Sequence, residues 1–175
     1  FRLKQGRLTI RLAHEFGFCY GVDRAIDYAY QTRAKFPDRR MFLTNEIIHN
    51  PRVNSKLLEM GVKFLSGPYA EPLSVEDIQK DDVVIIPAFG TPLDQLDAIQ
   101  KKECIVVDTT CGSVMSVWKR VESYARDGFT SVIHGKYDHE ETLATSSRAV
   151  RYPEGKFLIV RDRDEVAYVC DYIEG

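Results

Sequence analysis

The chain has 175 residues, 44% of them hydrophobic, which is enough to bury one large or two small cores. Its 24 Lys and Arg residues nearly balance 26 Asp and Glu residues, so the net charge is −2. That balance argues against general binding to nucleic acids or membrane surfaces, which requires a basic surplus. No apolar run reaches the length of a membrane span, and the start of the chain does not resemble a secretory signal. The chain lacks an initiator Met, which suggests an excised or processed segment.

Strand and helix signals alternate along the first hundred residues. Apolar runs predict strands at 8–13, 41–44, 62–65 and 83–86. Helical periodicity predicts helices at 22–35, 51–60 and 92–102, with a short helical turn at 74–78. Pro37 and Gly61 stand where the first two helices are expected to stop.

The same alternation continues to the end of the chain. Strands are predicted at 105–107, 130–133 and 156–160, and helices at 113–126, 139–147 and 163–173. This order is typical of an α/β fold built from parallel-sheet βαβ units. A new strand–loop–helix series starts near Lys102–Cys104. We therefore expect two consecutive small α/β domains, residues 1–102 and 103–175, each with one candidate ligand cysteine.

Four cysteines are too few for a disulfide scaffold and favour metal or redox use in a reducing compartment. Cys19 and Cys111 share a predicted setting, after a strand and just before a helix. Ligands bind at that edge of an open α/β sheet, and the positive helix end stabilises a thiolate. On position alone, a buried and inert role is equally favoured. Cys104 and Cys170 lack this setting and are expected to serve packing.

A histidine occupies a comparable position in the first half of the chain. His49 lies between a predicted strand and the helix that Pro51 opens, a place suited to an anion such as phosphate. The competing interpretation is a polar loop histidine that caps this helix.

Residues 134–141 gather several groups that could handle a diphosphate. His139 and Lys136 could bind it, and a carboxylic acid at Glu141 could deliver a proton. The competing interpretation is a solvated turn, with acidic residues favoured in the first turn of a helix.

Five loops are expected at the carboxyl ends of strands, and because parallel sheets put these ends on one edge, the loops of each domain should converge. They are 17–21, 45–51, 87–92, 108–112 and 134–141. In the third of these, Phe89 and Gly90 could line a pocket for a small apolar chain, or form a plain turn. Convergence of these loops predicts one site holding Cys, His and Glu, without naming a metal or substrate.

Several segments together resemble a known family. They are Gly17–Ala25, Asn45–Pro51, Asp108–Cys111 followed by Val117–Trp118, and His134–Thr142. In this order they are similar to the motifs of 4-hydroxy-3-methylbut-2-enyl diphosphate reductases of the LytB type, closest to the plastid and cyanobacterial branch. The resemblance runs from about Leu12 to Gly175.

The resemblance implies an iron–sulfur enzyme of the non-mevalonate isoprenoid pathway. Three cysteines of the family hold a [4Fe–4S] cluster, and Cys19 and Cys111 match two of them. His49 and His139 match the residues that hold the diphosphate, and Glu141 matches the proton donor. The reaction yields isopentenyl and dimethylallyl diphosphates, with electrons from ferredoxin or flavodoxin. No nucleic-acid or membrane partner is implied, and the expected location is the cytoplasm, or the plastid stroma of a photosynthetic eukaryote.

The sequence also departs from the family pattern. Phe89 stands where many members have histidine, although the plastid-like branch shares the phenylalanine, and Gly112 replaces a usual proline. The third cluster cysteine, the Ser-x-Asn substrate loop and the third domain have no counterpart in these 175 residues. We therefore expect this chain alone to be inactive. Two rival interpretations are a cluster-free phosphate-binding α/β module and a purely structural domain of a larger assembly.

Overall fold

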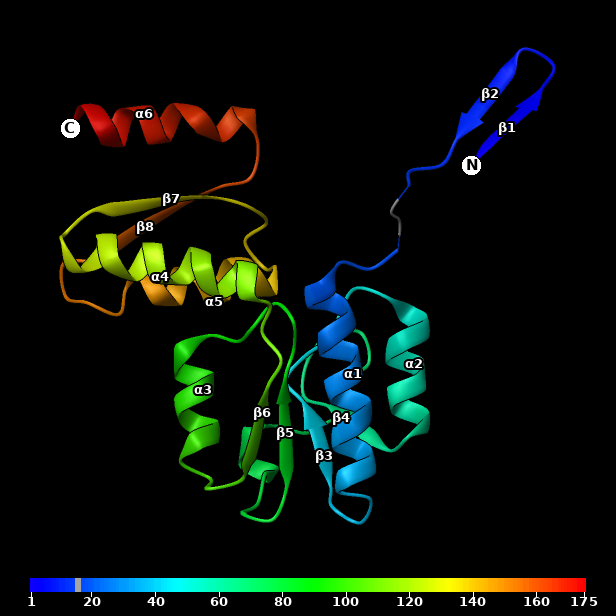
Figure 1. Cartoon of the computed structure of the whole chain (residues 1–175). Coiled ribbons are helices and arrows are strands. Elements are labelled where there is room, and N and C mark those ends of the chain that lie inside the picture. The colour runs from blue at the N-terminus through cyan, green and yellow to red at the C-terminus, as the bar shows by residue number, and fades with distance from the viewer. Residues whose placement is uncertain (15–16) are drawn as a thin grey trace.

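The computed structural model describes residues 1–14 and 17–175 and shows an α/β protein (Figure 1). It contains an N-terminal hairpin, a lobe built on a four-stranded sheet, and a smaller lobe built on a two-stranded sheet. The pairing within both lobes is parallel, which confirms the predicted fold class. Within these described ranges, every helix is too short or too polar to cross a membrane.

The N-terminal strand differs from the prediction. β2 (Leu8–Arg11) pairs antiparallel with β1 (Arg2–Gln5) and does not join a parallel sheet. The two strands meet at a tight turn in which Gly6 has a φ of +58°. A turn this short makes local pairing possible, whereas a parallel partner requires a long crossover. The hairpin projects from the first lobe with its side chains exposed (Figure 1).

The first lobe is a parallel sheet covered by helices on both faces. Its strands, in the order β4–β3–β5–β6, are Val62–Phe64, Met41–Leu43, Val83–Ile86 and Ile105–Asp108. Its helices are α1 (Tyr20–Lys35), α2 (Pro51–Glu59) and α3 (Leu93–Gln100), with a 3-10 turn at Val75–Asp77.

Alternate residues of each strand enter different cores. Met41 and Leu43 belong to the core formed with α1 and α2, whereas Phe42 packs with Ile99 of α3. Because both faces are buried, a central strand must be apolar at every position. This explains the unbroken apolar run of β5, whose four residues are all buried as the sequence predicts.

The strand predicted at 105–107, β6, lies after the expected domain boundary but belongs to the sheet of the first lobe. It pairs with β5, Ile105 opposite Val83 and Asp108 opposite Ile86. The change of sheet therefore comes after Asp108 and not near Lys102–Cys104. The three apolar residues of β6 become partly buried beside β5, which favours this pairing over the start of a separate sheet.

The second lobe is smaller. It contains β7 (Thr130–His134), β8 (Lys156–Val160), α4 (Gly112–Arg126), α5 (Glu140–Ala149), a 3-10 turn at Arg163–Glu165 and α6 (Val166–Glu174). Trp118, Val114 and Ala144 form the core between α4 and α5. Figure 1 shows this helix pair between the small sheet and the first lobe.

Trp118 also links the two lobes. Gly90, in the loop after β5, has a φ of +80°, and a Cβ at this position would overlap the Trp118 ring. The Arg148 guanidinium lies 4.3 Å from the centre of the same ring, and its burial lowers the pKa of Arg148. The Leu93 amide donates to Ser147 Oγ over 3.1 Å. The contacts of Gly90 with Trp118 and of Leu93 with Ser147 hold the first lobe against α4 and α5 of the second.

Candidate active site

Cys19 and Cys111 line one cavity. It has a volume of about 370 Å³ and is walled by the first residues of α1 and α4, including Tyr20, Gly21 and Gly112. Each cysteine is the N-cap of its helix, and neither makes a side-chain capping hydrogen bond. The two sulfurs are therefore available to a ligand beside two sets of free helix N–H groups.

The element that precedes Cys19 differs from the one predicted from the sequence. Cys111 follows β6 as expected, and its amide donates to Ala88 O over 2.9 Å. Cys19 follows the hairpin and not a strand of the parallel sheet. What the two cysteines share is the helix N-terminus, so the expected strand–turn–helix repeat is wrong for Cys19.

The cavity is shaped around the Cys111 sulfur. Gly21 lies so close that a Cβ at this position would overlap Cys111 Sγ. Arg24 adds a cation to the cavity wall. Two unprotected thiols, a cation and a glycine-lined wall fit an anionic cluster held by thiolates. The residues present therefore agree with the iron–sulfur site that the resemblance implies.

Gly21→Ala is expected to displace the Cys111 sulfur without unfolding the chain. An alanine near the start of a helix normally stabilises it by about 0.5–1 kcal/mol relative to glycine, and here the overlap opposes that gain. We expect a several-fold change in the rate at which Cys111 reacts with a thiol reagent, measured with the other three cysteines replaced by serine. Gly112→Ala is the matched control, because its Cβ would meet nothing within 4 Å. Equal effects of the two alanines on reactivity and unfolding would contradict this role for Gly21.

The other two cysteines lie elsewhere. Cys104 precedes β6, at the end of the strand opposite the Cys111 loop, and its thiol contacts Ile99 O at 3.7 Å. Burial raises the pKa of the Cys104 thiol, which disfavours the thiolate that a metal requires. Cys170 is exposed on α6. Neither residue lines the cavity of Cys19 and Cys111.

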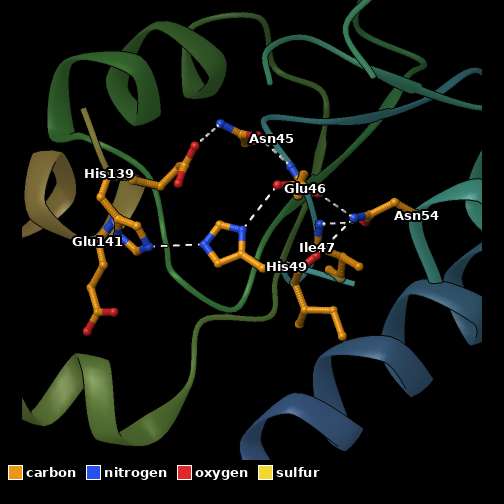
Figure 2. Close-up of polar contacts among 9 residues, drawn as sticks. Asn45, Glu46, Ile47, His49, Asn54, His139 and Glu141 are labelled. Atoms are coloured by element: carbon orange, nitrogen blue, oxygen red, sulfur yellow. Dashed lines mark hydrogen bonds and ion pairs between the residues drawn. The ribbon is translucent and has the colours of Figure 1, made fainter. Parts of the chain in front are cut away.

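The two predicted histidines face each other across the lobes. His49 Nε2 and His139 Nε2 are 3.0 Å apart, although 90 positions separate the residues (Figure 2). Behind them, His49 Nδ1 lies 3.1 Å from Glu46 Oε2, and Asn54 Nδ2 donates to Glu46 Oε1 over 2.9 Å. The pair is partly exposed, so a ligand can reach both rings.

Helix capping fixes the position of the His139 proton. His139 is the N-cap of α5, and its Nδ1 accepts from the Glu141 amide over 3.2 Å. The His139 proton must then be on Nε2, pointing at His49. The ligand atoms of His49, His139 and Glu140 lie within 4.8 Å of one another, which is close enough for a metal. However, a protonated Nε2 is a donor, so this arrangement favours an anion over a cation.

One loop joins the cysteine cavity to the histidine pair. Phe89 stacks on the His49 ring at a centroid distance of 4.4 Å, and the Ala88 amide donates to Ile47 O over 3.2 Å. Ala88 O in turn accepts from Cys111. The predicted convergence of the loops after β3, β5 and β6 therefore holds within the first lobe. Phe89 packs against a histidine, whereas the sequence left an apolar pocket and a plain turn equally open.

A second contact crosses between the lobes beside the histidines. Asn45 Nδ2 donates to Glu140 Oε1 over 2.5 Å, and Asn45 Oδ1 accepts from the Glu46 amide (Figure 2). The segment that carries His49 is thus tied to the residue that follows His139. The sequence pattern did not indicate these roles for four residues: Asn45, Glu46, Asn54 and Glu140. The first two lie inside the Asn45–Pro51 segment, but only their side-chain directions reveal the contacts.

Glu141 lies on the other side of His139. Its carboxylate points away from His49 in Figure 2 and lines a cavity of about 520 Å³ together with His134, Lys136 and Thr142. Glu141 therefore lies beside His139, which is predicted to bind phosphate, and Lys136 lines the same cavity. A carboxyl group at this position can deliver a proton to a ligand that His139 holds.

Comparison with known families and curated relatives gives consistent matches. The model of a family described as LytB protein matches residues 10–173. The 4-hydroxy-3-methylbut-2-enyl diphosphate reductase of Gloeobacter violaceus is 48% identical over 176 residues, which cover 99% of this chain and 41% of the relative. The reductase of that name from Synechococcus sp. strain ATCC 27144 is 51% identical over 174 residues, covering 99% and 42%. The chain spans about two-fifths of the length of these relatives.

Solved structures of diphosphate reductases also match this chain. An (E)-4-hydroxy-3-methyl-but-2-enyl diphosphate reductase, the terminal enzyme of the non-mevalonate pathway, superposes with a TM-score of 0.70 and 30% identity. The match covers 89% of this chain and 52% of that one. The E-1-hydroxy-2-methyl-but-2-enyl-4-diphosphate reductase of Plasmodium falciparum gives a TM-score of 0.73 at 26% identity, covering 86% and 44%.

Proposed function

We propose a reductase function on the premise that this chain belongs to the LytB protein family, as the match over residues 10–173 shows. We infer that the chain forms the first part of a 4-hydroxy-3-methylbut-2-enyl diphosphate reductase. The observation that supports this most strongly is the cavity in which Cys19 and Cys111 meet at two helix N-termini. A phosphate-binding module without a cluster would not require two unprotected thiols in one cavity.

Cys19 and Cys111 are proposed as two of the three thiolate ligands of a [4Fe–4S] cluster. The bound cluster would supply electrons and a Lewis-acidic iron for the alcohol oxygen of the substrate. Gly21 leaves room for the Cys111 sulfur, and Arg24 offsets part of the negative charge of the thiolates. Ferredoxin or flavodoxin is proposed as the electron donor.

The histidine pair is proposed to bind the diphosphate of the substrate. His139 presents an Nε2–H that helix capping has fixed in direction, and His49 is held by Glu46 and Phe89. Glu141 donates the proton that accompanies loss of the substrate hydroxyl as water. With two electrons and two protons, the products are isopentenyl or dimethylallyl diphosphate and water.

His139→Asn is expected to weaken binding of isopentenyl diphosphate to this chain by about ten- to a hundred-fold. Asparagine is a good N-cap and preserves the start of α5, but it removes the imidazole donor. A hydrogen bond to a charged group contributes about 1.5–3 kcal/mol. Titration calorimetry on this chain measures the change, with His14→Asn in the N-terminal segment as the control. Unchanged affinity in His139→Asn would contradict the proposed diphosphate site.

A further inference from the structure

Glu46 and Asn54 form a support behind His49 that the proposed reaction has not used. Asn54 is fully buried and all of its side-chain groups are engaged. Its Oδ1 accepts from the Ile47 amide, and its Nδ2 donates to both Ile48 O and Glu46 Oε1. These bonds fix which way the Asn54 amide faces. Glu46 Oε1 must therefore be an acceptor, and only Glu46 Oε2 faces His49.

The protons on the two imidazole rings can be counted from these contacts. A proton must lie between His49 Nδ1 and Glu46 Oε2, because two lone pairs would otherwise face each other at 3.1 Å. His139 Nε2 carries the second proton, since His139 Nδ1 accepts from the Glu141 amide. His49 Nε2 can then accept from His139 over 3.0 Å. One proton on each ring, at His49 Nδ1 and at His139 Nε2, therefore satisfies all of these contacts and leaves His49 neutral.

An anion changes this count. For both imidazoles to hold a diphosphate, both Nε2 atoms must donate, which requires a proton on His49 Nε2 as well as on His49 Nδ1. The titratable groups that face His49 are Glu46, His139 and Glu140. Of these, the Glu46 carboxylate contacts the ring directly and stabilises an imidazolium.

We propose that Glu46 is a positioning residue that makes His49 a double donor, so that binding of a diphosphate takes up one proton at His49. This inference rests on the proposed diphosphate site. It adds that diphosphate binding and proton uptake at His49 are coupled. The other bound protons stay in place, on His49 Nδ1 and His139 Nε2.

Glu46→Gln separates this role from a merely structural one. The glutamine oxygen can accept from Asn54 as Glu46 Oε1 does, so its amide group must face His49 and donate to Nδ1. His49 then carries its single proton on Nε2 and can donate to the ligand while neutral. The hydrogen bonds from Asn54 through residue 46 to His49 therefore all remain. His49 needs no second proton to donate to the diphosphate, and it does so as a neutral donor in place of a charge-assisted one.

The test is calorimetric titration of this chain with isopentenyl diphosphate in two buffers of different ionisation enthalpy. The pH is chosen so that the ligand is fully ionised. We expect the unchanged chain to take up close to one proton. Glu46→Gln should take up none and bind about tenfold more weakly. Glu59→Gln, on the exposed end of α2, should behave as the unchanged chain.

A second variant keeps the test informative if Glu46→Gln does not fold. His49→Gln offers an amide donor that cannot titrate, so it should bind without proton uptake. Binding by the unchanged chain without uptake, or full uptake by Glu46→Gln or His49→Gln, would overturn the role of Glu46 and His49 while leaving the diphosphate site intact. No binding by the unchanged chain, and none by a chimera in which this chain replaces the matching part of the Gloeobacter violaceus reductase, would overturn the diphosphate site itself, and this inference with it.

Discussion

Serine at Cys19 or Cys111 is expected to remove the iron–sulfur cluster, and all turnover, from a chimera in which this chain replaces the matching part of the Gloeobacter violaceus reductase. That relative is 48% identical to this chain and supplies the remaining length. Each cysteine is proposed to bind one iron from its own wall of the cavity. A serine oxygen at neutral pH is protonated and is a poor ligand for iron.

Iron and acid-labile sulfide are counted after anaerobic reconstitution, and turnover is measured with a reduced electron donor. Cys170→Ser is the matched control, because Cys170 is exposed on α6 and does not line the cavity. It should retain full iron content. A Cys111→Ser chimera with unchanged iron and turnover would refute the assignment of this cavity as the cluster site.

Glu141→Gln in the same chimera is expected to lower turnover by about 10²–10⁴-fold, the usual contribution of a positioned acid. Glutamine keeps the shape of the side chain but has no proton to deliver. Iron content should not change, because Glu141 lines the cavity beside His139 and Lys136 and not the cysteine cavity. Glu154→Gln, at an exposed position of the second lobe, is the control.

The two readouts separate the possible roles of Glu141. Normal turnover by Glu141→Gln would exclude it as the proton donor. Loss of iron would instead make Glu141 a structural residue. Only low turnover with a full cluster agrees with the proposed role.

Local pattern predicted most elements of the fold, because each strand and helix is set by nearby residues. The four apolar residues of β5 could hardly form anything but a doubly buried strand, and they do. Strand pairing was harder to predict. The sequence of β6 looks the same whether the strand closes one sheet or opens another, and its register against β5 is decided only by packing. For the same reason, β2 was assigned to a parallel sheet although β1 is its partner.

The candidate site could likewise be predicted only in part from the sequence. Residue type and position left both functional and structural roles open for Cys19, Cys111, His49 and His139, and the roles that the resemblance assigns to them remain predictions. The family membership inferred from the motifs is confirmed. The distances between these residues could not be predicted. A 3.0 Å approach of His49 to His139 depends on how the lobes pack, including the contact between Gly90 and Trp118. The support from Glu46 and Asn54 depends on side-chain directions that a loop sequence does not determine.

The number of irons bound after anaerobic reconstitution tests most directly whether Cys19 and Cys111 are two of three ligands. Two cysteines leave two irons of a cubane without a protein ligand, and the resemblance places the third cysteine outside these 175 residues. Iron counting and electron paramagnetic resonance of the reduced protein should therefore show a four-iron cluster on the chimera and no stable one on this chain alone. A stable four-iron cluster on the 175-residue chain, or a chimera that binds no iron, would contradict that assignment.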